Sequence, residues 1–303
     1  EANLYEIDLE FARRRPHMQW RAMLGDIRDT QRLETAFAEE RPDVVLHAAA
    51  LKHVPMSELN PGEAVRTNVI GTVNTIEMAK RYGARIVALI STDKAVDPGN
   101  VMGATKRAAE LYARSAAADG SETRICVVRF GNVLGSTGSV VPLFERQIEA
   151  GDPVTVTDPD ATRYFMTVEE ASGLVLDAAA QTAFDADLNG ALYVLDMGEP
   201  VSILRLARQL LRLRGRDPDA PGAISIVGLR PGEKRHENLV YAFERREPTA
   251  IDGVWSITGP VLDTEAVAAE LECLLDAARS GDAAAVSEAL GALCALRPAT
   301  AAD

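Results

Sequence analysis

Residues 91–106 hold the side chains with the clearest chemical potential in this sequence. An apolar run at residues 86–90 ends in Ser91, Thr92, Asp93 and Lys94. A hydroxyl, a carboxylate and an amine in succession can accept, hold and release protons. A second pair follows, because Met102 and Lys106 are four residues apart, the spacing that places two side chains on one face of a helix.

Two elements must position these groups. The run at 86–90 has the composition of a buried strand, and a Pro-Gly-Asn loop at 98–100 precedes a helix. Open parallel sheets bind their ligands at the carboxyl ends of their strands, so both sets are expected to meet in one crevice. The structural alternative is an ordinary polar loop followed by a solvated lysine.

The rest of the chain alternates strand and helix patterns, which favours an α/β fold. A helix between an Asn60 cap and Gly83 is supported by apolar residues at helical spacing. Strands are expected at 19–24, 43–48, 86–90, 124–130 and 224–229, and helices at 30–40, 60–83, 100 onward and 263–296.

Composition excludes several classes of function. The net charge of −13 leaves no basic stripe for nucleic acid, and no apolar run approaches the length of a membrane span. The four histidines lack metal-ligand spacing, so no metal site is expected. Three distant cysteines indicate unpaired thiols and a reducing, cytoplasmic environment.

Seven sequence blocks together resemble one family. They are HAAALKHVP (47–55), RTNVIGT (66–72), STDKAVDPGNVMGATKRAAE (91–110), VVRFGNVLGSTGSV (127–140), DATRYFMT (160–167), YVLDMGEPV (193–201) and GLRPGEKRHE (228–237). In this order they resemble the extended short-chain dehydrogenase/reductases, and more narrowly the UDP-N-acetylglucosamine 4,6-dehydratases of polysaccharide biosynthesis. The resemblance covers residues 1 to about 245.

The resemblance implies a Rossmann-like, doubly wound parallel sheet with a smaller C-terminal substrate lobe. Residues 1–140 would form an NAD(P)-binding domain, 141–250 an interleaved substrate lobe, and 251–303 a helical tail. The sequence contains no GxGxxG turn, and its start resembles the stretch after a second strand. The first strands of the sheet are therefore expected to be lacking, as in a truncated chain.

The resemblance also assigns binding residues. For the cofactor, NAD or NADP, they are Asp26, Ile27, Ala48, Ala49, Ala50, Asn68, Lys106 and Phe130. For the UDP-sugar they are Lys52, Asn132, Val154, Thr155, Arg163, Arg230 and Glu233. Two assignments have structural alternatives: a helix cap is the other role for Asp26, and a surface pair with each other is the other role for Arg230 and Glu233.

The reaction that the resemblance implies oxidises C4 of the hexose, eliminates water across C5 and C6, and returns the hydride to C6. Most of the superfamily uses a tyrosine at the position of Met102, and a thioether cannot carry a proton. The expected catalytic set is therefore Thr92, Asp93, Lys94, Met102 and Lys106. Lys94 is assigned as the base at C5, Asp93 as the acid/base toward O6 or O4, and Thr92 as the partner of O4.

Two other functions stay open. A nucleotide-sugar 4-epimerase on the same fold would normally need the tyrosine that Met102 replaces. A non-catalytic binding module is compatible with the missing phosphate turn. A cytoplasmic homo-oligomer is expected, as a free protein or as the soluble part of a membrane-anchored parent.

Overall fold

The computed structural model describes residues 1–15, 17–136, 138–260 and 262–297. Its α-helices are α1 (Ala2–Arg14), α2 (Thr30–Glu40), α3 (Val54–Leu59), α4 (Pro61–Val65), α5 (Gly71–Arg81), α6 (Val101–Ala117), α7 (Val140–Ala150), α8 (Val168–Phe184), α9 (Ile203–Leu213), α10 (Thr264–Ser280) and α11 (Ala283–Ala295). A π-helical turn η1 (Arg66–Ile70) joins α4 to α5, and two 3-10 turns are η2 (Asp93–Ala95) and η3 (Ala186–Leu188).

The main sheet has six strands, in the order β1-β2-β3-β8-β12-β11. The strands of the whole chain are β1 (Val44–His47), β2 (Ile86–Thr92), β3 (Arg124–Phe130), β4 (Asn132–Val133), β5 (Val154–Val156), β6 (Thr162–Arg163), β7 (Phe165–Met166), β8 (Leu192–Leu195), β9 (Val201–Ser202), β10 (Ile224–Ile226), β11 (Arg245–Pro248) and β12 (Val254–Thr258). Strands β1, β2, β3 and β8 are parallel, whereas β12 and β11 are antiparallel to their neighbours. The expected α/β class is thus confirmed.

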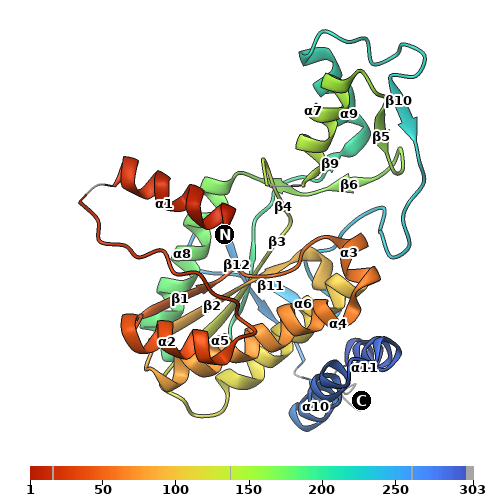
Figure 1. The fold of residues 1–303 in the computed structure, drawn as a ribbon. Coiled ribbons are helices and arrows are strands. Elements are labelled where there is room, and N and C mark those ends of the chain that lie inside the picture. The colour runs from red at the N-terminus through yellow and green to blue at the C-terminus, as the bar shows by residue number, and fades with distance from the viewer. Residues whose placement is uncertain (16, 137, 261, 298–303) are drawn as a thin grey trace.

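Helices cover both faces of this sheet. Helices α5 and α6 lie on one side and α8 on the other (Figure 1). Strand β2 is buried along nearly its whole length because it is covered on both faces, which explains its continuous apolar sequence. Strand β1 is an edge strand, and its Val44 and Leu46 side chains are 51% and 46% exposed.

A smaller lobe stands above one end of the sheet (Figure 1). Helices α7 and α9 pack against the parallel pair β5–β10 around a core of their own, which includes Phe144, Ile148 and Leu211. The chain is interleaved, because α8 and β8 return to the main sheet between the two halves of the lobe. Strand β12 also joins that sheet before α10 and α11, which pack on α6.

Two local expectations from the sequence differ from the structure. Residues 19–24 were expected to form a strand, but they are irregular and pair with no strand in the described chain. The helix expected at 60–83 is instead three consecutive segments, α4, η1 and α5, with Asn68 inside the π-helical turn. The three cysteines are unpaired thiols, as expected.

Candidate active site

Strand β2 ends in the predicted proton-handling residues. The Thr92 side chain caps η2 by accepting from the Lys94 backbone N–H, which fixes the turn directly after the strand. Asp93 is fully buried, and its Oδ1 accepts from Thr92 Oγ1 (2.8 Å) and from Lys94 Nζ (2.9 Å). Asp93 Oδ2 is buried without a hydrogen-bond partner among the described residues.

Lys94 joins two elements at the mouth of the sheet. Besides its ion pair with Asp93, its Nζ donates to Oδ1 of Asn132 at 3.2 Å, and Asn132 belongs to β4 beyond the end of β3. Gly131 lets β3 leave close to Asp93: a Cβ at this position would lie 2.9 Å from Cβ of Tyr164 and 3.3 Å from Asp93 Oδ2. The carboxyl ends of β2 and β3 thus hold one ion pair between them.

Helix α6 brings the second predicted pair to the same place. Its Asn100 cap accepts from the Gly103 N–H at 2.9 Å, and Gly103 lets the helix start against the Lys94 turn, because a methyl group there would overlap the Lys94 carbonyl. Lys106 Nζ donates to the Ile90 carbonyl at 2.6 Å. Burial lowers the pKa of Lys106 from its ordinary 10.5 to about 8, partly offset by the charge of Glu110.

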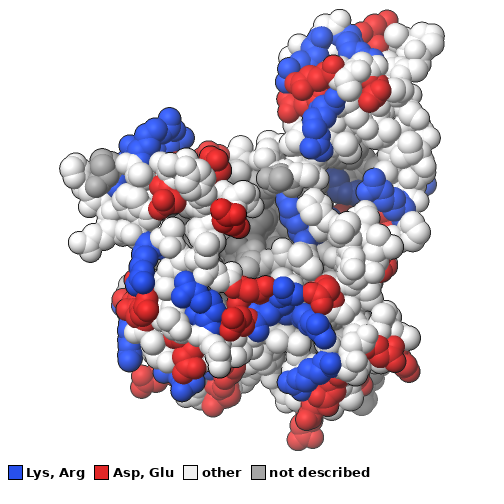
Figure 2. All heavy atoms as spheres, viewed as in Figure 1, with Lys and Arg blue, Asp and Glu red and all other residues white. Residues whose placement is uncertain are grey.

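These groups surround a crevice of about 340 Å³ at the carboxyl end of the sheet. The molecular surface is hollowed between the sheet and the lobe (Figure 2). The crevice brings together nine of the predicted site residues: Ala48, Ala50, Lys52, Thr92, Lys94, Met102, Lys106, Phe130 and Asn132. Asp93 does not line it, because it lies behind Lys94 and Thr92.

Two predicted cofactor residues lie close to the crevice without lining it. Ala49 stands between two alanines that do. Asn68 is buried one layer behind: its amide donates to the Leu51 carbonyl and to Thr105 Oγ1, and its oxygen accepts from the Leu51 N–H. Asn68 therefore fixes the loop after β1 against α6, in a π-helical turn of the kind often found at functional sites.

A second cavity of about 210 Å³ adjoins the crevice. The two cavities share Asn132, Gly138, Ser139 and Val140. Five of the predicted substrate residues line the second cavity: Asn132, Thr155, Arg163, Arg230 and Glu233. Val154 does not, because its side chain is fully buried in the core of the lobe.

The partners of Glu233 and the two arginines separate their possible roles. Glu233 binds Arg163 (3.2 Å) and Thr157, so it does not form the surface pair with the Arg230 side chain that was the alternative reading. The Arg163 guanidinium also donates to the carbonyls of Thr162, Lys234 and Arg235. The hydrogen-bond donors of Arg163 are therefore largely taken up by partners within the lobe. The Arg230 side chain is exposed, and its guanidinium is available for an anion.

Asp26 and Ile27 lie away from the crevice. Asp26 forms an ion pair with Arg28 at 2.7 Å, and hydrogen bonds from Arg28 lower the pKa of its carboxyl group. It lines a separate depression next to Arg66. Asp29, and not Asp26, caps helix α2, which removes the alternative role considered for Asp26. Ile27 packs on Gly71 of α5.

Sequence reasoning missed Glu237. Its side chain is buried, its Oε2 has no hydrogen-bond partner in the described chain, and burial raises its pKa while the nearby Asp93 charge adds to the shift. The segment that carries Glu237 is tied to the Lys94 turn, since Lys234 Nζ donates to the Val96 carbonyl at 2.7 Å. Its place at the end of the block GLRPGEKRHE was the available signal.

A crevice at the carboxyl ends of parallel strands, with helices on both faces, defines an α/β protein with a Rossmann-like fold. Comparison with known proteins then narrows the class. A family described as polysaccharide biosynthesis proteins matches residues 1–258, and the chain belongs to this family.

Individual relatives agree with that assignment. The chain is 48% identical to the capsular polysaccharide biosynthesis protein CapD of Staphylococcus aureus over 241 residues, which are 79% of this chain and 39% of that protein. It is 37% identical to a UDP-glucose 4-epimerase of Rickettsia typhi over 80% of this chain and 68% of that protein. The chain thus spans about two fifths of the length of CapD.

Solved structures share the fold. Pen from Bacillus thuringiensis is 35% identical, with a TM-score of 0.74 over 86% of this chain and 78% of that one. DesIV, a dTDP-glucose 4,6-dehydratase from Streptomyces venezuelae, is 22% identical, with a TM-score of 0.66 over 77% of this chain and 74% of that one. Within the described ranges, no helix has both the length and the apolar character needed to cross a bilayer.

Proposed function

We propose that this chain is the catalytic part of a nucleotide-sugar 4,6-dehydratase that acts on UDP-N-acetylglucosamine with NAD or NADP. The observation that carries the proposal is the set of groups around the crevice. An ammonium paired with a buried carboxylate stands where protons must move, and a thioether occupies the position of the usual phenol. The family membership and the relative that takes part in capsule synthesis support the same class of reaction.

The crevice fits the nicotinamide end of such a cofactor. Ala48 and Ala50 leave room beside the backbone of β1, and Lys106 presents a buried amine whose pKa of about 8 keeps it able to donate hydrogen bonds to ribose hydroxyls. No GxGxxG turn is present in the sequence, so residues for the pyrophosphate are not assigned. When bound, the cofactor would supply reversible hydride transfer, with the hydride taken from C4 and returned to C6.

The residues of the chain would handle the protons. Lys94 Nζ lines the crevice and is assigned, in its free-amine form, to take the proton from C5, which is acidic next to a C4 ketone. Asp93 does not line the crevice, so its assigned part in returning the proton to the departing C6 hydroxyl runs through Lys94 Nζ, 2.9 Å away. Thr92 is assigned to hold O4, and Met102 to exclude water from the face where other enzymes place a phenol.

The second cavity is assigned to the UDP group. Arg230 presents a planar guanidinium that can engage two phosphate oxygens at once, and Glu233 can accept from the ribose hydroxyls. Asn132 and Ser139 line both cavities, so a sugar in the crevice and a diphosphate in the second cavity would be continuous. Because the chain carries a net charge of −13, an anionic substrate would have to be held by a few local cations such as Arg230.

A 4-epimerase is the second candidate, favoured by the epimerase of Rickettsia typhi. Mass spectrometry separates the two, because dehydration removes one water from UDP-N-acetylglucosamine whereas epimerisation leaves the mass unchanged. We expect the dehydrated product, and we expect Asp93→Asn and Lys94→Met to abolish it while Arg205→Gln, at an exposed site in the lobe, does not. An epimer of unchanged mass would contradict the proposal, as would dehydration at the wild-type rate by Asp93→Asn.

A further inference from the structure

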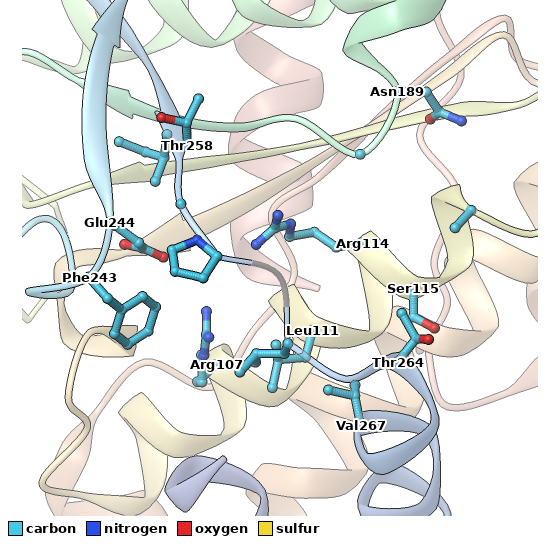
Figure 3. Close-up of a pocket in the computed structure, with 16 residues that line it drawn as sticks. Arg107, Leu111, Arg114, Ser115, Asn189, Phe243, Glu244, Thr258, Thr264 and Val267 are labelled. Carbon is cyan, nitrogen blue, oxygen red and sulfur yellow. The ribbon is translucent and has the colours of Figure 1, made fainter. Parts of the chain in front are cut away.

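A separate cavity of about 230 Å³ lies on the side of α6 that faces the C-terminal helices. It is bounded by α6, the chain at residues 243–244, the end of β12 and the start of α10 (Figure 3). Among the described residues, none lines both this cavity and the crevice. It is therefore distinct from the site proposed for the substrate.

The charges around this cavity do not balance. Glu110 accepts from Arg129 at 2.7 Å and from Arg107 at 3.2 Å, and Glu244 pairs with Arg129 at 2.7 Å. Arg114 completes the group, so three guanidinium groups face two carboxylates. The four groups Arg107, Arg129, Glu110 and Glu244 form one neutral cluster, which leaves the positive charge of Arg114 in excess.

Arg114 has no ion pair or hydrogen bond from its guanidinium within the described part of the chain. Its side chain extends from α6 into the cavity, and Arg107 points toward the same space (Figure 3). Burial and the repulsion from Arg107 both lower the pKa of Arg114, so the structure holds this cation at an energetic disadvantage. An unpaired, partly buried charge of this kind is strongly stabilised by an opposite charge.

The walls indicate what else the ligand must contain. Leu111, Ile257 and Val267 form apolar surface, and the Phe243 ring closes the side opposite α6 (Figure 3). The hydroxyls of Ser115 and Thr264 stand together at the rim, available to an anion oxygen. A few polar groups in a mostly apolar cavity are typical of sites for small organic ligands.

We propose that this cavity binds a small organic anion, a phosphate or carboxylate group carried on an apolar body, with Arg114 as its principal ion-pair partner. The anion neutralises the excess charge, and the apolar body lies against Leu111 and Phe243. Nothing in this assignment depends on the reaction in the crevice.

Calorimetric titration of the full chain with phenyl phosphate tests the proposal. We expect saturable binding, at least about tenfold tighter than that of inorganic phosphate, and a loss of about tenfold or more in affinity for Arg114→Gln, as expected for one charge-assisted hydrogen bond. Arg114→Lys should retain more affinity than Arg114→Gln. Arg114→Gln should also melt no lower than the wild type, because it removes an unpaired cation.

The control is Arg230→Gln, which removes the exposed arginine of the substrate lobe and should leave this binding unchanged. Equal affinity of wild type and Arg114→Gln would overturn the proposal. So would a loss of binding in Arg230→Gln alone, which would place the anion in the second cavity of the substrate lobe. Equal affinity for phosphate and phenyl phosphate would overturn the claim that the ligand carries an apolar body. A lack of saturation below about 10 mM phenyl phosphate would overturn the claim that the cavity is a binding site.

Discussion

Glu110 is the residue whose replacement tests the packing behind the crevice most directly. It is fully buried on α6, and its two oxygens accept from Arg129, Arg107 and Ser91 at 2.6 to 3.2 Å. The substitution Glu110→Gln keeps the shape of the side chain and removes the charge. Arg129, which is also fully buried, would then have Glu244 as its one remaining carboxylate among the described residues.

Two routes give the same magnitude for the loss of stability. Breaking a buried ion pair by removing one partner lowers the free energy of unfolding by about 3–5 kcal/mol. Independently, the charges of Arg129 and Arg107 outweigh burial and lower the pKa of Glu110 from 4.5 to about 2, and a shift of that size corresponds to about 3 kcal/mol. We therefore expect Glu110→Gln to destabilise the chain by about 3 kcal/mol at neutral pH.

The sign of the pH dependence follows from the direction of the shift. Because the folded pKa lies below the unfolded one, the stabilisation by Glu110 is complete above pH 4.5 and is lost as the pH falls toward 2. Urea unfolding should show this decrease in the wild type. The decrease should be smaller in Glu110→Gln, which has no carboxyl group at that position to protonate.

The matched control is Glu10→Gln, because Glu10 pairs with Arg14 on α1 with both side chains more than half exposed, and exposed pairs contribute at most about 1 kcal/mol. A loss below about 1 kcal/mol for Glu110→Gln, with fluorescence and circular dichroism transitions that coincide, would refute the reasoning. An unchanged acid dependence in that variant would refute the assigned pKa.

Three further predictions concern other parts of the fold. Gly103→Ala should lower both stability, by about 1–3 kcal/mol in urea unfolding, and turnover, because a methyl group would displace the Lys94 turn; a wild-type rate would contradict this. The stability of the wild type should rise with pH between about 8 and 10.5, because in that range the unfolded chain binds more protons at Lys106 than the folded chain does. Lys106→Met should abolish this rise, and parallel pH profiles of the two proteins would disprove it. Val44→Lys, on the open edge of β1, should reduce concentration-dependent scattering, and no change would show that this edge does not associate.

The central part of the fold was predictable because local and global signals agree there. The apolar run before Thr92 can bury all of its side chains only as a strand covered on both faces. The polar residues after it then lie at the carboxyl end of the sheet. The four-residue spacing of Met102 and Lys106 placed both on one face of α6, and both line the crevice.

Other elements depend on partners that are distant in the sequence. Residues 19–24 have a strand-like composition, but composition alone does not specify a pairing partner. They bond to none of the described strands, and β1 remains the edge of the sheet. Val154 could have been excluded as a ligand from sequence alone: alternate residues of a strand share a face, and Val154 and Val156 are both buried while Thr155 lines the cavity. Apart from the Thr162 carbonyl, the partners of Arg163 lie 70 to 72 residues later, so no local pattern indicates them.

The turn that carries Lys94 is fastened to residues well over a hundred positions further along. Lys234 donates to the Val96 carbonyl, Asn100 to the Gly232 carbonyl, and Tyr241 to the Ala95 carbonyl. Grafting the loop at 228–237 from a relative would therefore also disturb the geometry of Lys94 and Asp93, the groups proposed to transfer protons. Chimaeras in this family should exchange the segments 94–100 and 228–241 as one inseparable module.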